Sequence, residues 1–572
     1  MRGLFIACAA GALFAISAAA QPAIRSSLGV VNASSNTSDV ARGSWFVVYG
    51  TGLGPASIVV ASGAPYPSQL SSTQVTFTPA AGGAQVSALL WYTLSTQVAA
   101  MLPSSTPAGA YDVKVTYNGQ TSAAQRVAVV ERNFGFATQA QNGLGPAQAT
   151  YGGLDLNRFT TGQIDKWATR PAKVGDVIVL WGTGLGADSA SDTTGGTSGD
   201  QTSAAQVKVM VDNVEVTPAY AGRSNGSPGL DQINFTVPSG VSPNCFATLY
   251  VKAGGRISNF GSLAIAAAGQ SACPSSSLTS AQLTQLDQGA TLTIGTLSLS
   301  KLGLKVTVPV LGTIDQTSES ASGSFARYSI SDVATSNFAF TQTGSCFVSK
   351  RVGTTGDIVS GALPTALDAG TKLTLNGPNA SNIALPGTAG VYGATLYNSG
   401  FSGIGASGTP TIAQGSYTIA GTGGANIGAF SANLTVPGTF TWSNQSSIAN
   451  PVPRNAPLNV TWTGGTSGLV AITGMSGTAT GGTATNPTYD ATVFVCIAPA
   501  SAGSFTVPSS VLTQLPQASS DVTSATTSGA LLVVAVPDPS QGSFTAPLVG
   551  GGTLDHGYFT YSIGSMKTTG WN

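Results

Sequence analysis

Two glycine-rich stretches with the same spacing are candidate phosphate-binding sites, because closely spaced glycines allow the backbone to bind a phosphate group. VVYGTGLGP begins at Val47, and IVLWGTGLGA begins at Ile178. Their glycines are Gly50, Gly52, Gly54, Gly182, Gly184 and Gly186. A dinucleotide site needs such glycines to open a helix, whose N-terminus holds the pyrophosphate. Ser, Gly, Pro and β-branched residues follow both stretches instead, and the spacing is not GxGxxG, so we expect no nucleotide cofactor.

The same stretches fit a corner at which a buried strand turns into a loop. An apolar run precedes each corner, at Trp45–Tyr49 and at Val177–Trp181, and glycine permits the positive φ of a tight turn. Further correspondences between the two copies are Gly43 with Gly175, Gln74 with Gln206, and TQVAAMLP with DQINFTVP. A period of about 130 residues is far longer than that of stacked repeats, so the sequence predicts two duplicated domains.

The repeated blocks resemble a known family of domains. The strand with its GTGLG corner, DQINFTVP and VKAGGRISNFGSLAIA are similar to an uncharacterised immunoglobulin-like domain, related to the IPT/TIG group, that recurs in exported proteins of soil-dwelling bacteria. Residues 172–273 match well, and the first copy matches mainly at its glycine corner. Blocks between about 345 and 565 resemble the β-rich region that accompanies these domains. The resemblance implies a β-sandwich fold and export, and it implies no activity.

Alternation of apolar and polar residues predicts strands along the whole chain. Leu292, Ile294, Leu297 and Leu299 begin such a run, whose period of two is typical of half-buried strands. We therefore expect an all-β protein, with tandem Ig-like β-sandwich domains followed by a β-rich C-terminal region. The expected boundaries are a signal peptide at 1–20, an N-terminal segment at 21–39, a first sandwich at 40–131, a connecting segment at 132–171, a second sandwich at 172–273, a Ser/Thr-rich linker at 274–290, a β-rich domain at 291–440 and a sandwich-like C-terminal domain at 441–572.

The N-terminal sequence predicts export. One Arg, an apolar run from Leu4 to Ile16, and small residues at Ala18 and Ala20 are typical of a signal peptide cleaved before Gln21. Lipidation of Cys8 is the alternative, and the position of this cysteine inside the apolar run disfavours it. No later stretch holds about 18 consecutive apolar residues, so we expect no transmembrane helix and a secreted or cell-surface location.

Cysteine pairing follows from that location. Cys245, Cys273, Cys346 and Cys496 remain after cleavage, and an even number in an oxidising compartment predicts disulfides. Of the three possible connectivities, spacing favours Cys245–Cys273 and Cys346–Cys496, and the family often carries a pair like the first. A zinc site is the alternative, but CxxC spacing is absent and His556 is the single histidine, so we expect no metal.

Groups for catalysis are sparse. His556 follows Asp555, but adjacent strand residues face opposite sides and no GxSxG is present, so we interpret His556 as exposed or incidental. A glycosidase needs two carboxylates across a cleft. The glutamates are Glu131, Glu215 and Glu319, and the aspartates in turn-like contexts include Asp155, Asp165, Asp231 and Asp357. Asp231 lacks the DxDxDG spacing of a calcium loop. We expect no catalytic residue and no enzyme.

Tryptophans could instead stack on sugar rings. Trp181 and Trp462 lie in strand patterns where a large apolar residue is most often core, and Trp442 is a further candidate. Trp91 and Tyr92 are neighbours and are expected to face opposite sides of a strand. We expect about one exposed tryptophan.

Composition narrows the class of partner. Charged residues make up 8%, and 22 Lys and Arg balance 22 Asp and Glu, so the basic surface of a nucleic-acid binder is missing. The sequence favours a non-catalytic extracellular or cell-surface structural and adhesion-type protein, whose partner is an extracellular polymer or another surface protein. The alternative is a secreted carbohydrate-binding or glycan-hydrolysing protein.

Overall fold

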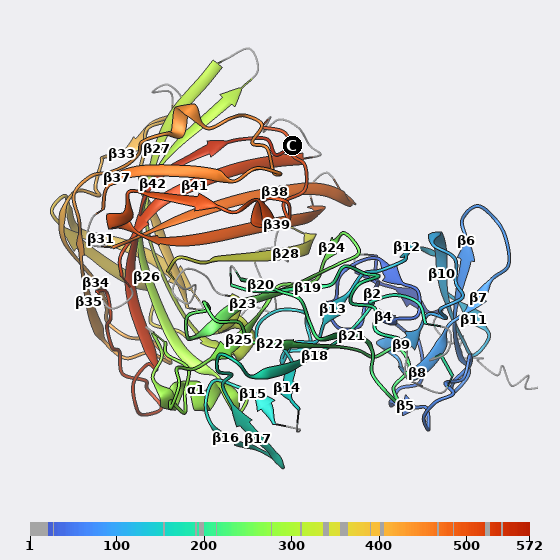
Figure 1. Ribbon diagram of the computed structural model, residues 1–572. Coiled ribbons are helices and arrows are strands. Elements are labelled where there is room, and N and C mark those ends of the chain that lie inside the picture. Colours follow the sequence, from blue (N-terminus) through green and yellow to red (C-terminus); the bar gives the residue numbers. More distant parts are fainter. Residues whose placement is uncertain are drawn as a thin grey trace, which may run out of the picture.

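The computed structural model describes residues 21–572 apart from 27, 153–154, 189–191, 194–198, 213, 276, 309–311, 336–342, 355–363, 389, 401–404, 466–467, 484–485, 521–526 and 539–540. The predicted signal peptide with Cys8, and Asp357, lie outside the described residues. The fold is all-β, which confirms the predicted class. Figure 1 shows three units in chain order, with a first sandwich at the right, a second in the middle and a C-terminal sheet at the left.

The first sandwich packs two sheets around a core that includes Phe46, Val48, Phe77 and Val113. One sheet has the order β1 (Ala23–Ile24), β4 (Trp45–Thr51), β9 (Gln97–Met101), β8 (Leu89–Leu94) and β5 (Val59–Val60), with β2 (Val30–Asn32) also on β4. The other has the order β3 (Val40–Ala41), β12 (Gln125–Val130), β10 (Gly109–Tyr117), β6 (Thr73–Pro79) and β7 (Val86–Ser87), with β11 (Gln120–Thr121) on β10. Because β1 and β2 pair with β4, the sandwich begins before the predicted start at residue 40.

The second sandwich has the same two-layer build, with Ile178, Leu180, Val209 and Leu249 in its core. One sheet has the order β16 (Gly162–Ile164), β17 (Trp167–Arg170), β15 (Leu156–Asn157), β14 (Ala149–Tyr151), β18 (Val177–Thr183), β22 (Asp231–Thr236) and β21 (Tyr220–Arg223), with β13 (Gly135–Phe136) on β18. The other contains β20 (Val214–Val216), β19 (Lys208–Val211), β23 (Asn244–Ala253), β24 (Arg256–Ile257) and β25 (Gly261–Ile265). The predicted connecting segment at 132–171 is therefore part of this sandwich, because β13 and β14 pair with β18.

The predicted Ser/Thr-rich linker at 274–290 contains a helix, α1 (Ser280–Asp287). Thr279 caps its N-terminus, and the Gln282 amide caps the Thr279 backbone in return, which completes a capping box. Leu283 and Leu286 are buried against Phe159 and both cysteines of the Cys245–Cys273 disulfide. The helix therefore packs between the second sandwich and the C-terminal sheet.

One continuous sheet runs through most of the C-terminal half and crosses the predicted division at residues 440 and 441. Its order among the described residues is β28 (Cys346–Thr354), β39 (Asn486–Pro499), β38 (Leu469–Thr483), β41 (Thr527–Val536), β42 (His556–Thr568), β26 (Leu292–Val308), β27 (Gly312–Tyr328), β32 (Val391–Asn398), β31 (Ala380–Thr388), β30 (Lys372–Gly377), β34 (Gly415–Gly421) and β35 (Phe430–Val436). Small strands β29 (Thr365–Ala366) and β33 (Ser407–Gly408) pair with β27 and β32. The parallel pairing of β26 with β42 joins the two predicted domains.

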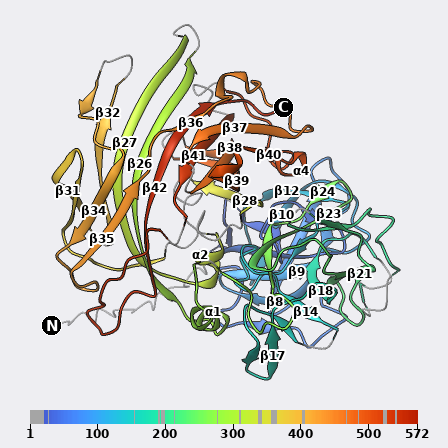
Figure 2. The same cartoon turned by 60° about the vertical axis from the view of Figure 1, so that its left-hand side comes forward.

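This long sheet folds back on itself, so that β31, β34 and β35 lie over β26, β27 and β42 (Figure 2). Its other end packs against a small sheet of β36 (Phe440–Trp442), β37 (Leu458–Gly464) and β40 (Ser504–Val507). Short helical turns complete the fold: α2 (Ile330–Thr335), η2 (Gln445–Ser447), η3 (Ala500–Ala502) and α4 (Ser509–Leu512). The second predicted disulfide, Cys346–Cys496, is present and joins directly paired residues of β28 and β39.

Candidate functional site

The two glycine corners end β4 and β18 and shape the backbone there. Three corner glycines have the positive φ that favours glycine: Gly52 at 64°, Gly184 at 105° and Gly186 at 128°. The other three are packed closely, and an added Cβ would collide with Ala23 at Gly50, with Thr93 at Gly54 and with Gly135 at Gly182. In the part of the chain that the structure describes, a loop and then a strand follow each corner, so the corners hold no helix N-terminus for a phosphate.

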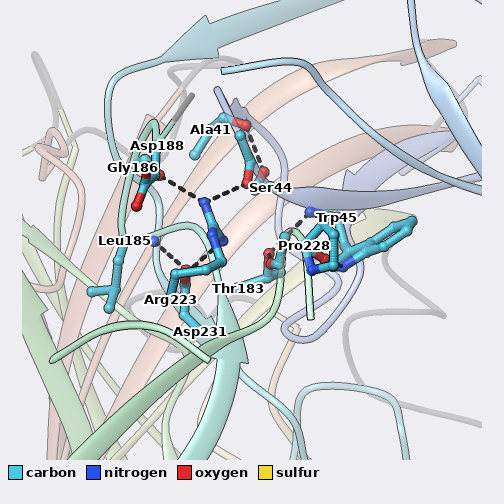
Figure 3. Close-up of polar contacts among 12 residues, drawn as sticks. Ala41, Ser44, Trp45, Thr183, Leu185, Gly186, Asp188, Arg223, Pro228 and Asp231 are labelled. Atoms are coloured by element: carbon cyan, nitrogen blue, oxygen red, sulfur yellow. Dashed lines mark hydrogen bonds and ion pairs between the residues drawn. The ribbon is translucent and has the colours of Figure 1, made fainter. Parts of the chain in front are cut away.

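A fully buried ion pair lies behind the second corner (Figure 3). Arg223 on β21 and Asp231 on β22 are directly paired, and Nη1 of Arg223 lies 2.7 Å from Oδ1 of Asp231. Both side chains are 0% exposed. The second carboxylate oxygen accepts a 2.7 Å hydrogen bond from the backbone N–H of Leu185 in the corner. Burial raises the pKa of Asp231, and the Arg223 guanidinium opposes that shift.

The same guanidinium reaches across to the first sandwich. Nη2 of Arg223 donates to the carbonyl oxygen of Gly43 at 2.8 Å and to that of Gly186 at 3.1 Å. Gly43 precedes β4, so one side chain links the corner of the second sandwich to the backbone of the first. Sequence reasoning missed Arg223. The available signal was the turn-rich segment SNGSPGL, which an Arg and an Asp bracket as they would in a hairpin.

Trp45 forms the second anchor of this junction. Its backbone N–H donates to the Thr183 hydroxyl at 2.9 Å, and its indole N–H donates to the carbonyl oxygen of Pro228 at 2.8 Å. Thr183 in turn donates to the carbonyl oxygen of Gly229 at 2.6 Å. Figure 3 shows Trp45 on one side of the junction and Arg223 on the other, with Thr183 between them. The two sandwiches are therefore held together by buried polar contacts.

An aromatic ledge, made of Trp45, Tyr66, Trp91 and Tyr92, lies beside the junction on the first sandwich. Trp91 is 45% exposed, and its ring centroid lies 5.4 Å from those of both Trp45 and Tyr92. The expectation that Trp91 and Tyr92 face opposite sides is wrong. A β-bulge between Leu90 and Tyr92 places Trp91 as the extra residue, and a bulge re-aims side chains in this way.

The remaining tryptophans named above are mostly core. Trp442 and Trp462 are buried in the core beneath the small sheet, as expected for Trp462. Trp181 is only half buried, because it lies on the outer face of β18, where its indole N–H donates to the Thr150 hydroxyl at 3.0 Å.

The glutamates lie in three different units, each beside a basic side chain. Glu131 pairs with Arg42 at 3.2 Å, Glu215 with Lys252 at 3.1 Å and Glu319 with Lys301 at 2.9 Å. Glu319 is fully buried, and its other oxygen accepts from the backbone N–H groups of Thr411 and Ile412. Asp165 has a positive φ of 51° in the turn between β16 and β17, as its turn-like context predicts, and Asp155 precedes β15.

His556 begins β42 and is partly buried, which corrects its interpretation as exposed. Burial lowers the pKa of its imidazole, and its ring lies 5.5 Å from that of Tyr558. Asp555 does not orient it. The Asp555 carboxylate instead accepts from the backbone N–H and the hydroxyl of Thr293, at 2.7 and 2.6 Å. Among the residues that the structure describes, no triad is thus brought together at His556.

A second polar junction joins the second sandwich to the C-terminal unit. The carboxylate of Asp287, at the end of α1, accepts from the backbone N–H groups of Phe159 and Thr160 at 3.1 and 2.9 Å and from the Thr160 hydroxyl at 2.9 Å. Burial raises the pKa of Asp287, and these donors oppose the shift. The Thr248 hydroxyl donates to the carbonyl oxygen of Cys346 at 3.2 Å, beside the second disulfide.

The described residues contain neither a metal-binding cluster nor a membrane-spanning helix. Among the described residues, no three His, Cys, Asp or Glu side chains gather as metal ligands would. Within the same ranges, every helix is too short or too polar to span a bilayer.

Comparison with known proteins bears on the fold alone. No protein-family model matches the chain, and no curated protein matches it. SGBP-B of the mixed-linkage glucan utilization locus of Bacteroides ovatus, in complex with a mixed-linkage heptasaccharide, is 11% identical, with 63% of this chain and 67% of that chain covered and a TM-score of 0.19. Domains 5–6 of the S-layer protein SbsC are 13% identical, with 43% and 99% covered and a TM-score of 0.18.

Immunoglobulin domains 1–4 of Sidekick-1 are 9% identical, with 93% of this chain and 98% of that chain covered and a TM-score of 0.11. Such low identities and TM-scores carry no information about ligands. The β-sandwich class stands on the sheets themselves, and the relation to the IPT/TIG group stays a prediction.

Proposed function

We propose that the protein is a non-catalytic extracellular or cell-surface structural and adhesion-type protein. The observation that carries this proposal is the Arg223 junction, because one buried side chain fixes the second sandwich onto the first. Modules joined in this way keep a constant spacing, which suits a strut that transmits force between a surface and a partner. Interfaces between domains of one chain are otherwise expected to permit relative motion.

The two disulfides support an extracellular or cell-surface location. Both pairs lie where the second sandwich meets the C-terminal unit, and disulfides persist in oxidising compartments outside the cytosol. Export through the predicted signal peptide would bring the chain to such a compartment. The partner expected for this function is an extracellular polymer or another surface protein.

The test measures whether surfaces or polysaccharides retain the protein and whether the protein releases fragments from them. Purified protein is passed over immobilised bacterial cell surfaces and extracellular polysaccharides, and the eluate is analysed by mass spectrometry for released fragments. Saturable retention without fragments is the expected result. Fragments that accumulate in proportion to protein and time, and that disappear in a variant of one carboxylate, would make the chain a hydrolase and overturn the proposal.

A further inference from the structure

We infer that the aromatic ledge of Trp45, Tyr66, Trp91 and Tyr92 binds a neutral polysaccharide, with one sugar ring stacked on Trp91. This inference rests on the proposed adhesive function, since it names the class of polymer to which the protein adheres. Ligand sites occur preferentially where domains meet, and the ledge adjoins the junction of the two sandwiches through Trp45.

The rings of the ledge pack against one another without any ligand. Trp91 is wedged between Trp45 and Tyr92, with interplanar angles of 54° and 60°, and Tyr66 meets Trp45 edge to face at 83°. Trp45 is itself fixed to Pro228 of the second sandwich. A ring held by neighbouring rings loses little conformational entropy on binding, which favours affinity.

The surface beside Trp91 is apolar and open. Val60 on β5 is 54% exposed and pairs directly with Tyr92, so both side chains lie on the same face of the sheet. Ile58, two residues earlier, is 56% exposed. These residues extend the ledge along the edge of the sheet, which gives a chain longer than a monosaccharide a continuous contact.

The charge pattern selects a neutral ligand. From Gly43 to Tyr111, the segment that supplies the entire ledge, the sequence contains no Asp, Glu, Lys, Arg or His. An anionic polymer or a nucleic acid would find no cation within this segment, and Arg25, on the same sheet beyond Tyr92, lies over the ring of Tyr49. A basic peptide would find no carboxylate. Hydroxyl-rich, uncharged chains lose the least solvation free energy on contact with such a surface.

The ledge also offers hydrogen-bonding groups at the edges of its rings. Among the described residues, neither the Trp91 indole N–H nor the Tyr66 hydroxyl has a protein hydrogen-bond partner, whereas the Trp45 indole N–H is used by Pro228. A pyranose ring has an apolar face of C–H groups and a rim of hydroxyls, which matches an exposed indole with polar edges. The Trp91 indole contacts the rings of Trp45 and Tyr92, and a proline-rich peptide, which also binds between aromatic rings, is the competing occupant in the experiment below.

The experiment measures binding of the purified protein to soluble β-glucan, xylan and galactomannan by affinity gel electrophoresis and by quenching of tryptophan fluorescence. Trp91→Ala is expected to weaken binding of the preferred polymer by about tenfold or more, and Trp91→Tyr by only about threefold, because a smaller ring keeps part of the stacking. The matched control is Trp167→Ala, which removes a partly exposed tryptophan of β17 and is expected to leave affinity unchanged.

A second variant guards against loss of folding. Val60→Glu places a charge on an exposed position of the ledge without removing a buried group, and it is expected to weaken binding as Trp91→Ala does. Circular dichroism confirms that each variant is folded. Failure to bind any of the three polymers, equal binding by Trp91→Ala, or displacement of the polymer by a proline-rich peptide would overturn the inference.

The outcomes for the ledge and for the proposed function are distinguishable. Retention on cell surfaces that Trp91→Ala leaves intact, without binding to neutral polysaccharide, would refute the ledge and preserve the adhesive function. Fragmentation of a polymer would refute the non-catalytic function, and the ledge would still be judged by the Trp91 variants.

Discussion

Arg223 and Asp231 differ from the other ion pairs in being completely withdrawn from water. Burying two charges costs more than their attraction returns unless further hydrogen bonds satisfy them. Leu185 on one side and Gly43 with Gly186 on the other supply those bonds. The pair therefore specifies the geometry of the junction, and its stabilising effect depends on both members being present.

Arg223→Met is expected to lower the free energy of unfolding by about 3–5 kcal/mol, because it leaves the Asp231 carboxylate buried without its counter-charge. Urea denaturation followed by circular dichroism measures the change. Adding Asp231→Asn should recover part of the loss, since a neutral amide still accepts from Leu185. The control is Arg126→Met, which breaks the exposed Arg126–Asp112 pair and should leave the midpoint unchanged. Equal midpoints for Arg223→Met and wild type would contradict the role of the pair.

Asp212 gives a prediction of pH dependence. Burial raises its pKa to about 6, although the Thr248 backbone N–H donates to it at 2.8 Å. A carboxyl whose pKa is raised by folding stabilises the protein below its ordinary value near 4, and that stabilisation is lost as the pH rises through about 6. Asp212→Asn is neutral at every pH, can still accept from Thr248, and suits the positive φ of 49° at this position.

The variant should therefore be more stable than wild type at pH 8 by on the order of 2 kcal/mol, and should show little difference at pH 3. Urea denaturation at both pH values measures this. A gain of equal size at the two pH values would show that charge on Asp212 is not the cause.

Some of the important side chains could be predicted from the sequence, and others could not. The corner glycines and the cysteine pairs could be predicted, because a repeated motif and an even count point to them directly. Trp91 could not be placed, since the bulge that turns it outward depends on the register of β8 against β9. Arg223 could not be placed either, because its partners lie on three separate segments of the chain.

Among the structural elements, the long alternating strands were predictable and the short ones were not. The alternating run from Leu292 is a single strand, β26, in which Leu292 and Ile294 are buried in one core and Leu297 and Leu299 in another. Strands of two or three residues, such as β13 and β15, are too short to show a period. The helix α1 has eight residues, and its capping box from Thr279 to Gln282 was the one local signal for it.

The glycine corners allow conformational strain to be separated from close packing. Gly184 has a positive φ of 105°, and a Cβ there would collide with the carbonyl oxygen of Asn133. Gly175 has a similar φ of 90° but open space around a Cβ. Gly175→Ala is expected to cost about 1–2 kcal/mol through backbone strain alone. Gly184→Ala should cost at least about 2 kcal/mol more, because backbone atoms must move.

Thermal and urea unfolding of the two variants, side by side, measure that difference. If Gly184→Ala and Gly175→Ala lost the same stability, the corner glycine would be required for its φ alone, and the close approach to Asn133 would have no energetic weight.

For the molecule as a whole, the two sandwiches contact each other through polar groups, and the second sandwich contacts the C-terminal unit through both apolar and polar groups. Met210, Tyr250 and Phe260 of the second sandwich share a core with Trp571 and the Cys346–Cys496 disulfide. The sequence predicted four β-rich domains, and the last two share one sheet, because the pairing of β26 with β42 joins segments that are far apart in the chain. Local patterns of apolar and polar residues do not indicate which distant strands pair with each other.

Rigidity would distinguish the proposed structural protein from a string of flexible modules. Small-angle X-ray scattering of the purified protein, at low and at high salt, measures it. The buried junction of Arg223 is poorly screened by ions, so we predict one scattering curve at both salt concentrations, fitted by the single arrangement in Figure 1. A curve that requires an ensemble of orientations between the two sandwiches, or a radius of gyration that grows with salt, would contradict the proposed role of the junction.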